Sequence, residues 1–320
     1  MEHLVHTCSP QPHPLAGDPE KTAYLDLVSD GHFWRTSSIL SASYTVLEDG
    51  EDRTHAFSAD PAKEEDEFEL LSALVPMLRG EGIFYTFNGT SFVMPYLGRK
   101  LKAYDLPNPL ENAVHRDLYR ILKPLYYMLR LPSRRMSDYY PFTGFPEFYS
   151  DALPALTHLF PFLVFPGSEV IPEEVKPRLE KMTREDPCVY MTISLPYAVP
   201  KKISYSAGPY YLIADGDRIF CSVRMENETV RRYYPDYENY AYLPVEGYAV
   251  HRSVASYVPK DRQIPAQLDN CFTRIRVTDE FLGNAEMQEA YLSSIRSLIR
   301  TSVTEKTPFA ECVPETENSL

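Results

Sequence analysis

Three segments near the start of the chain decide the fold: TAYLDLV at residues 22–28, SILSASYTVL at 38–47 and RTHAFS at 53–58. Each is rich in β-branched and aromatic residues and bounded by turn-forming residues, a pattern typical of strands. The run EDGED at 48–52 supplies Asp and Gly residues that favour a tight turn. We therefore predict an antiparallel meander of three strands.

The next segments continue the fold with a helix, a buried strand and a second helix. Apolar residues recur at helical spacing through residues 62–79, and Gly80 follows where a helix commonly ends. The acidic run at 64–67 could be taken for a metal site, but acids in a first turn favour the helix dipole. Residues 83–87, IFYTF, predict a strand buried on both faces, and residues 91–104 predict a helix.

This order predicts an α/β fold with an RNase H-like mixed sheet and flanking helices, followed by a β-rich extension and a C-terminal helix. Further helices are expected at 114–130, 151–165 and 279–303, and further strands at 188–195, 202–213, 218–225 and 247–258. On the helix at 279–303 the predicted apolar face comprises Met287, Tyr291, Ile295, Leu298 and Ile299. We divide the chain into a disordered tail at 1–20, an RNase H-like domain at 21–165, a β-rich extension with its terminal helix at 185–303 and a disordered tail at 304–320.

The composition limits the classes of function. The net charge of -13 argues against strong, general binding of nucleic acid, although it leaves room for a local basic groove. The five cysteines are widely spaced without a CxxC pair, which excludes the usual zinc motifs and fits free thiols in a reducing compartment. No apolar run is long enough to span a bilayer. We expect a soluble cytoplasmic protein with no membrane partner.

Four segments together resemble one family. YLDLVSDG at 24–31, TFNGTSFVMPYL at 86–97 and VHRDLYRIL at 114–122 stand in the order of its motifs, FFDIETTG, HFNG-x-x-FD-x-PYL and D-[LI]-Y. The tyrosine-rich block that runs from 195 to 258 resembles an extension found in one of its subgroups. The chain thus resembles the YprB-like branch of the RNase H-like 3′–5′ exonucleases, within the DEDD (DnaQ-like) superfamily.

The resemblance implies a site for two divalent metals held by four carboxylates, which hydrolyse a phosphodiester. Asp26 matches the first carboxylate and is the candidate metal ligand, whereas Val28 and Val93 stand where the family has the Glu and the second Asp. The last Asp falls at Ala152, with Asp151 beside it. Valine cannot ligate Mg²⁺, so we interpret the chain as a degenerate and catalytically inactive relative.

Two alternatives remain open. An active Mg²⁺- or Mn²⁺-dependent exonuclease could have rebuilt its site from Asp26, Asp30, Asp117 and Asp151, although Asp30 also suits a turn and Asp117 a helix start. An unrelated activity could instead lie in the second half, around residues 231–242 and His251. If the chain is inactive, no cofactor is expected.

The expected partner is single-stranded nucleic acid, and no protein partner is predicted. Candidate contacts are Asn88 in the motif at 86–97 and the neighbours Arg231, Arg232 and Tyr233. Aromatic and basic side chains together suit the binding of a single strand. Tyrosine is also favoured in half-buried strands, so a structural role for this block is the competing interpretation.

Overall fold

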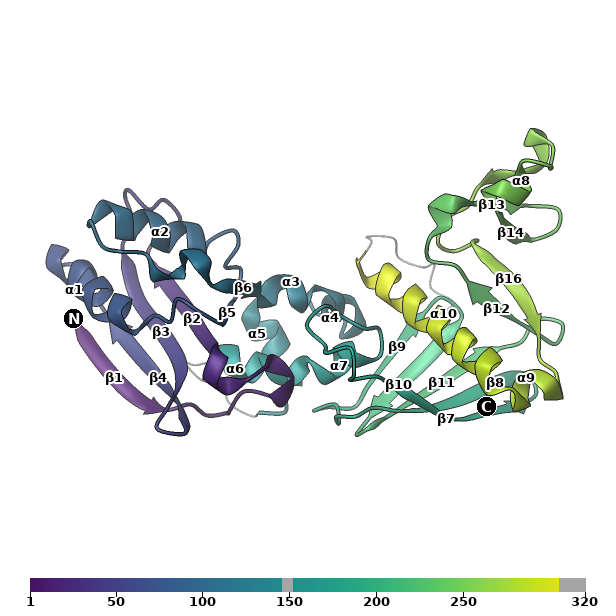
Figure 1. Ribbon diagram of the computed structural model, residues 1–320, viewed down its shortest axis with the longest axis horizontal. Helices are drawn as coiled ribbons and strands as arrows, with labels where there is room; N and C mark the ends of the chain where they lie inside the picture. The colour runs from purple at the N-terminus through teal and green to yellow at the C-terminus, as the bar shows by residue number, and fades with distance from the viewer. Residues whose placement is uncertain (146–151, 305–320) are drawn as a thin grey trace, which may run out of the picture. The chain divides into compact units, whose positions relative to one another are not determined.

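The structure is a computed structural model that describes residues 1–145 and 152–304. The chain divides into two compact units (Figure 1). Unit 1 comprises Met1–Tyr126, Leu131–Phe160 and Val170–Pro172; unit 2 comprises Tyr127–Arg130, Pro161–Glu169 and the described part of Glu173–Leu320. No helix in the described ranges is both long and apolar enough to cross a membrane.

Unit 1 is built on a six-stranded mixed sheet in the order β1-β4-β3-β2-β5-β6. The first four strands of this order pair antiparallel, and β2, β5 and β6 pair parallel. The mixed sheet confirms the RNase H-like class expected from the sequence, although β1 and β6 were not predicted. The strands are β1 (Glu2–Thr7), β2 (Thr22–Ser29), β3 (Ile39–Glu48), β4 (Glu51–Ser58), β5 (Ile83–Thr86) and β6 (Val114–Asp117).

Two helices cover one face of this sheet (Figure 1), α1 (Glu64–Leu74) and α2 (Val93–Ala103). Their apolar residues share one core with Leu25 and Leu27 of β2 and Phe84 of β5. Shorter helices follow: α3 (Leu118–Ile121), α4 (Lys123–Met128), α5 (Met136–Tyr139), α6 (Ala152–Leu156) and α7 (Pro161–Val164). Within unit 1, α6 packs against β2.

Unit 2 contains a five-stranded antiparallel sheet in the order β7-β8-β11-β10-β9. Its strands are β7 (Arg178–Glu185), β8 (Cys188–Ser194), β9 (Ile203–Ala207), β10 (Tyr210–Asp215) and β11 (Arg218–Arg224). Smaller sheets pair β12 (Thr229–Tyr233) with β16 (Phe272–Arg276), and β13 (Tyr240–Leu243) with β14 (Tyr248–His251) and β15 (Ile264–Pro265). The helices are α8 (Arg252–Ala255), α9 (Asp279–Gly283) and α10 (Ala285–Thr304).

The long helix α10 lies along the five-stranded sheet (Figure 1) and contacts β7, β9 and β12. Tyr291, Ile295, Leu298 and Ile299 are buried on one side of this helix, as the sequence predicts. Met287 precedes Tyr291 by one turn on the same side of the helix but is 37% exposed, so the buried part of this face begins at Tyr291. The α/β fold with a β-rich second half and a C-terminal helix is confirmed.

The expected disordered tail at 1–20 is wrong for the described structure. Residues 2–7 form β1, which pairs along its whole length with β4. Residues 14–16 and 19–21 form two short 3-10 helices, and Leu15 and Ala16 are buried. The pairing explains the difference, because an edge strand takes its hydrogen bonds from a distant partner and needs no apolar pattern of its own. Residues 305–320, the predicted C-terminal tail, lie outside the described residues.

Three element boundaries also differ from the prediction. Residues 114–117 are not the start of a helix but the parallel strand β6, which takes its backbone hydrogen bonds from β5. The predicted strand at 202–213 is a hairpin, because Gly208 (φ 56°) turns the chain between Ala207 and Tyr210. The predicted strand at 247–258 ends at His251, where α8 begins.

Candidate functional site

Asp26 lies on β2, on the face of the sheet that α1 and α2 do not cover. Side chains alternate along a strand, so Asp26 shares this face with Tyr24, whose ring stacks on Tyr85 at 5.3 Å between centroids. Phe160 lies beyond Tyr85, at 6.2 Å between ring centroids. Asp26 is partly buried, and this burial raises the pKa of its carboxyl group to about 6, against a backbone hydrogen bond at Leu27 that lowers it. A carboxyl group with a raised pKa in such a place is a functional-site candidate.

The two valines at the expected ligand positions lie in opposite environments. Val28 follows Asp26 on the same face and is 49% exposed. Val93 begins α2, is 1% exposed and belongs to the core shared by α1, α2 and the sheet. A hydrocarbon side chain offers no ligand at either position. Asp26 therefore lacks the two carboxylates that the resemblance would place beside it.

Asp117 performs a structural task. It caps the N-terminus of α3, where its Oδ1 accepts a hydrogen bond from the backbone N–H of Tyr119 at 3.1 Å. Its Oδ2 accepts another from the N–H of Thr90 at 3.0 Å. The carboxylate is buried and ties the loop before α2 to the start of α3. Both of its oxygen atoms are thus already engaged by the backbone.

Strand register also separates Asp117 from Asp26. Tyr24 pairs with Tyr85 across β2 and β5, and Thr86 pairs with Asp117 across β5 and β6. Paired residues share a face and consecutive residues alternate, so Asp117 projects to the face opposite Asp26. The carboxylate set of the rebuilt-site alternative is therefore not brought together by the sheet.

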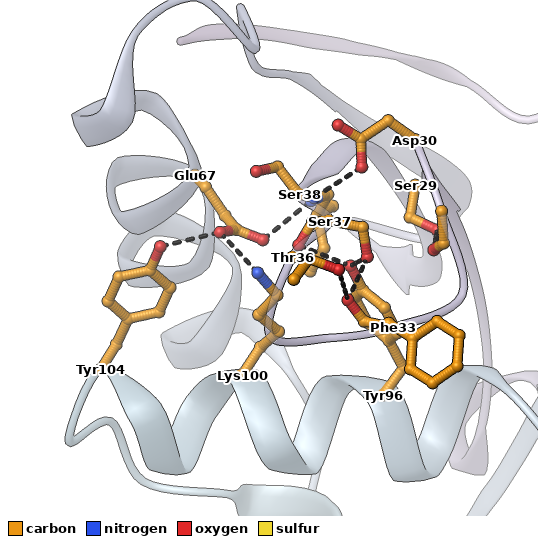
Figure 2. A network of polar contacts seen from close by, with 12 residues as sticks. Ser29, Asp30, Phe33, Thr36, Ser37, Ser38, Glu67, Tyr96, Lys100 and Tyr104 are labelled. Atoms are coloured by element: carbon orange, nitrogen blue, oxygen red, sulfur yellow. Dashed lines mark hydrogen bonds and ion pairs between the residues drawn. The ribbon is translucent and has the colours of Figure 1, made fainter.

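The remaining members of that set do not complete it. The Oδ1 atom of Asp30 accepts a hydrogen bond from the N–H of Ser38 at 2.7 Å and closes the loop between β2 and β3 (Figure 2). Asp151 lies outside the described residues. Within residues 1–145 and 152–304, no group of three or more His, Cys, Asp or Glu side chains is placed to hold a metal ion.

Asn88 lies in the turn that follows β5. Its φ is 58°, and its carbonyl oxygen accepts a hydrogen bond from the N–H of Phe92 at 2.9 Å. The next residue, Gly89, lies against a hydrogen-bonded pair formed by Thr86 and His115, 2.7 Å apart, where a Cβ would collide with both side chains. Burial lowers the pKa of His115. The turn positions the N-terminus of α2 by close packing, and Asn88 itself is partly exposed.

The acidic first turn of α1 has a role that the sequence did not reveal. Glu67 is buried, and its Oε2 accepts hydrogen bonds from Lys100 Nζ of α2 at 2.9 Å and from Tyr104 Oη at 2.7 Å (Figure 2). Its Oε1 accepts one from the N–H of Ile39 at 2.8 Å. Lys100 is also buried, so the pair joins α1, α2 and the start of β3 in the protein interior. The interpretation of this acidic run by the helix dipole alone is therefore incomplete for Glu67.

In unit 2 the candidate nucleic-acid contacts are mostly engaged within the protein. Tyr233 is 3% exposed and lies between Tyr210 and Phe272, so its ring faces are not open to a base. Arg231 lies over the ring of Phe272 at 4.5 Å and forms an ion pair with Glu226 at 2.6 Å.

The other polar groups of this block also have structural tasks. Arg232 lies over the ring of Tyr234 at 5.7 Å. His251 caps α8, with its Nδ1 accepting a hydrogen bond from the N–H of Ser253 at 3.3 Å. The competing interpretation, a structural role for the tyrosine-rich block, fits these contacts.

A cavity of about 240 Å³ lies in unit 1. It is formed by the segment before β2 together with Tyr24 and Asp52. Burial raises the pKa of the Asp52 carboxyl, against the charge of Arg79, which lowers it. Asp26 does not line this cavity, so the cavity adds no group to the candidate site.

Comparisons with known proteins find similarity only at the level of solved structures. No protein-family model and no curated protein matches the chain. Escherichia coli exonuclease I in complex with a dT13 oligonucleotide is similar with a TM-score of 0.35 and 12% identity, over 91% of this chain and 75% of that chain. The same enzyme with a 5cy-dA13 oligonucleotide gives a TM-score of 0.34 and 11% identity, over 91% and 75%. Similarity at this level does not establish a family.

Proposed function

We propose that this chain is a non-catalytic relative of the RNase H-like exonucleases, of the YprB-like branch, that acts as a nucleic-acid-binding or interaction module. The observation that carries the proposal is the absence of a carboxylate at residues 28 and 93, beside a single partly buried Asp26. Two-metal hydrolysis needs several oxygen ligands to hold both ions and to activate water. Asp26 alone supplies one carboxylate, and its raised pKa disfavours the ionised form that binds a metal ion. A single such group cannot hold two metal ions.

The partner in this proposal is single-stranded nucleic acid, and the proposed compartment is the cytoplasm. The described cysteines, Cys8, Cys188, Cys221 and Cys271, form no disulfide with one another, which agrees with a reducing compartment. Burial raises the pKa of the Cys221 and Cys271 thiols to about 12, so neither is a reactive thiolate at neutral pH.

The test is a nuclease assay on labelled single- and double-stranded DNA and RNA, with Mg²⁺, Mn²⁺ or EDTA. The full chain is compared with Asp26→Ala, and Glu111→Gln serves as a control for the loss of an exposed acid of unit 1. We expect no cleavage by any of the three proteins, and nucleic-acid binding that EDTA does not change. Metal-dependent cleavage that disappears in Asp26→Ala alone would overturn the proposal and establish the rebuilt exonuclease site instead.

A further inference from the structure

The five-stranded sheet of unit 2 has one buried face and one exposed face. Buried and exposed residues alternate along β8, β9, β10 and β11, and the buried set includes Tyr210 and Leu212 of β10. The hydroxyl groups of Tyr210 and Tyr291 of α10 are 3.2 Å apart, which places α10 on the buried face. The other face, here called the outer face, carries the exposed residues of these strands and of β7.

Three aromatic side chains gather at the centre of the outer face. Tyr190 of β8, Phe220 of β11 and Tyr211 of β10 are 43%, 43% and 47% exposed. Tyr190 and Tyr211 both pair with Ser222 of β11, and Phe220 lies two residues before Ser222. Neighbouring strands are about 4.8 Å apart, so the two tyrosines lie about 10 Å apart with the phenylalanine diagonally between them. Each of the three side chains is thus partly open to solvent.

Most of the residues that pair with the three rings are polar, and Ser222 separates the two tyrosines. Thr192 and Ile213 pair with Phe220, and Ser206 and Thr183 complete the row that holds the two tyrosines. Ile213 is the one aliphatic neighbour in these two rows, and the other residues beside the rings are polar or charged. A protein interface core of comparable size is normally more continuous and more apolar.

Basic residues outnumber acidic ones around the aromatic group. The register places on the outer face the basic residues Arg178, Lys181, Lys202, Arg218 and Arg224 and the acidic residues Glu185 and Asp215, and Glu180 pairs with Arg218 at 3.5 Å. Lys181 and Arg224 form no ion pair with any described residue. A local excess of positive charge on a chain whose net charge is -13 is complementary to phosphates.

We infer that the outer face of the β7–β11 sheet binds single-stranded nucleic acid, with bases stacked on Tyr190, Phe220 and Tyr211 and phosphates held by Lys181 and Arg224. This inference rests on the function proposed above and names its surface. Single strands expose unstacked bases, every base has a π-face, and base–aromatic stacking needs no particular sequence. A duplex hides those faces, so the surface discriminates against it.

The test measures binding of fluorescently labelled oligo-dT, oligo-dA and oligo-rU, and of a duplex, by anisotropy. The full chain is compared with Tyr190→Thr/Phe220→Thr/Tyr211→Thr, in which threonine keeps the preference for a strand. Tyr257→Thr is the matched control, because Tyr257 is 90% exposed and lies in unit 2 outside this sheet. Circular dichroism and thermal melting establish that every variant is folded.

Removal of one stacking ring weakens single-strand binding about tenfold. The triple variant is therefore expected to bind all three oligonucleotides at least 100-fold more weakly, and Tyr257→Thr is expected to bind as the full chain does. If the full chain binds and the folded triple variant binds equally well, the inference is overturned while the proposed function stands. If the full chain binds no nucleic acid at all, the nucleic-acid-binding role proposed above fails and the inference with it.

One further outcome assigns the surface to a second copy of the chain. In that case the triple variant keeps its affinity for oligonucleotides, while sedimentation shows a dimer of the full chain becoming a monomer. That result also overturns the inference.

Discussion

The carboxyl group of Asp26 sits in an environment that disfavours its charge. Burial raises its pKa to about 6 in the folded protein, whereas an ordinary aspartate in an unfolded chain titrates near 4. Between these values the folded state binds more protons than the unfolded state. The contribution of Asp26 to the free energy of unfolding therefore decreases as pH rises from about 4 to 6 and stays low above that.

Asp26→Asn is accordingly expected to stabilise the protein at neutral pH. The two-unit displacement of the pKa corresponds to about 1–2 kcal/mol once partial hydration is allowed for. Urea denaturation at pH 7.5 should show a gain of this size, and the gain should vanish near pH 4. A loss of stability at pH 7.5 would mean that the ionised carboxylate has a favourable partner, as a bound cation would provide.

The carboxylate of Asp117 stabilises the fold by accepting two backbone hydrogen bonds. In Asp117→Ala the N–H groups of Thr90 and Tyr119 both lose their acceptor. The expected loss is about 1–2 kcal/mol in the free energy of unfolding, the usual cost of removing a helix cap. Asp117→Asn should retain part of the stabilisation, because the amide oxygen can accept one of the two hydrogen bonds. Calorimetric titration with Mn²⁺ should give the same result for Asp117→Ala and the unmodified chain, and a difference would return Asp117 to the metal site.

At the scale of elements, α1, α2 and the start of β3 are joined by the buried pair of Glu67 and Lys100 (Figure 2). Both side chains are buried, so water cannot replace either partner when the other is left unpaired. Replacing both partners of such a pair is often far less harmful than replacing one, because the single variant leaves a charge buried and uncompensated.

Lys100→Met is therefore expected to lower the free energy of unfolding by about 3–5 kcal/mol. The double variant Glu67→Gln/Lys100→Met should recover much of this loss. The glutamine oxygen can still accept from the N–H of Ile39, and its NH2 group can donate to the Tyr104 hydroxyl. Chemical denaturation of the two single variants and the double variant gives the coupling between them. Additive losses would show that the two side chains act independently.

The elements that the sequence predicts well are those whose own pattern is strong. The meander of β2, β3 and β4 follows from alternation and from the turn at Asp49-Gly50, where both residues have positive φ. The helix predicted at 62–79 stops as an α-helix at Leu74, because Pro76 lacks the N–H that a helix needs. The sequence does not predict β1 and β6 because they are edge strands whose conformation depends on pairing with a neighbouring strand.

At the scale of the whole molecule, the net charge of -13 and the basic excess on the outer face of unit 2 act in opposite directions on a polyanion. The binding of a single strand by such a surface depends strongly on salt, because each phosphate contact releases a counterion. Lys181→Glu and Arg224→Glu are each expected to reduce the slope of log affinity against log salt concentration by about 0.7 or more. Lys260→Glu, at an exposed site outside this sheet, is the control for net charge. Equal slopes for all three variants would place the phosphates elsewhere.

The sequence by itself determined the α/β class, the order of the central strands, the amphipathic C-terminal helix and the valines at residues 28 and 93. These features depend on local periodicity, turn chemistry and residue identity, which are legible without coordinates. Only the tertiary structure decided that Asp26 and Asp117 face opposite sides of one sheet, that Tyr233 is buried and that Glu67 meets Lys100. It also brought Tyr190, Phe220 and Tyr211 onto one face. Each of these features depends on strand register or on packing between distant segments. Register and long-range packing cannot be recognised from the pattern of a short stretch of sequence.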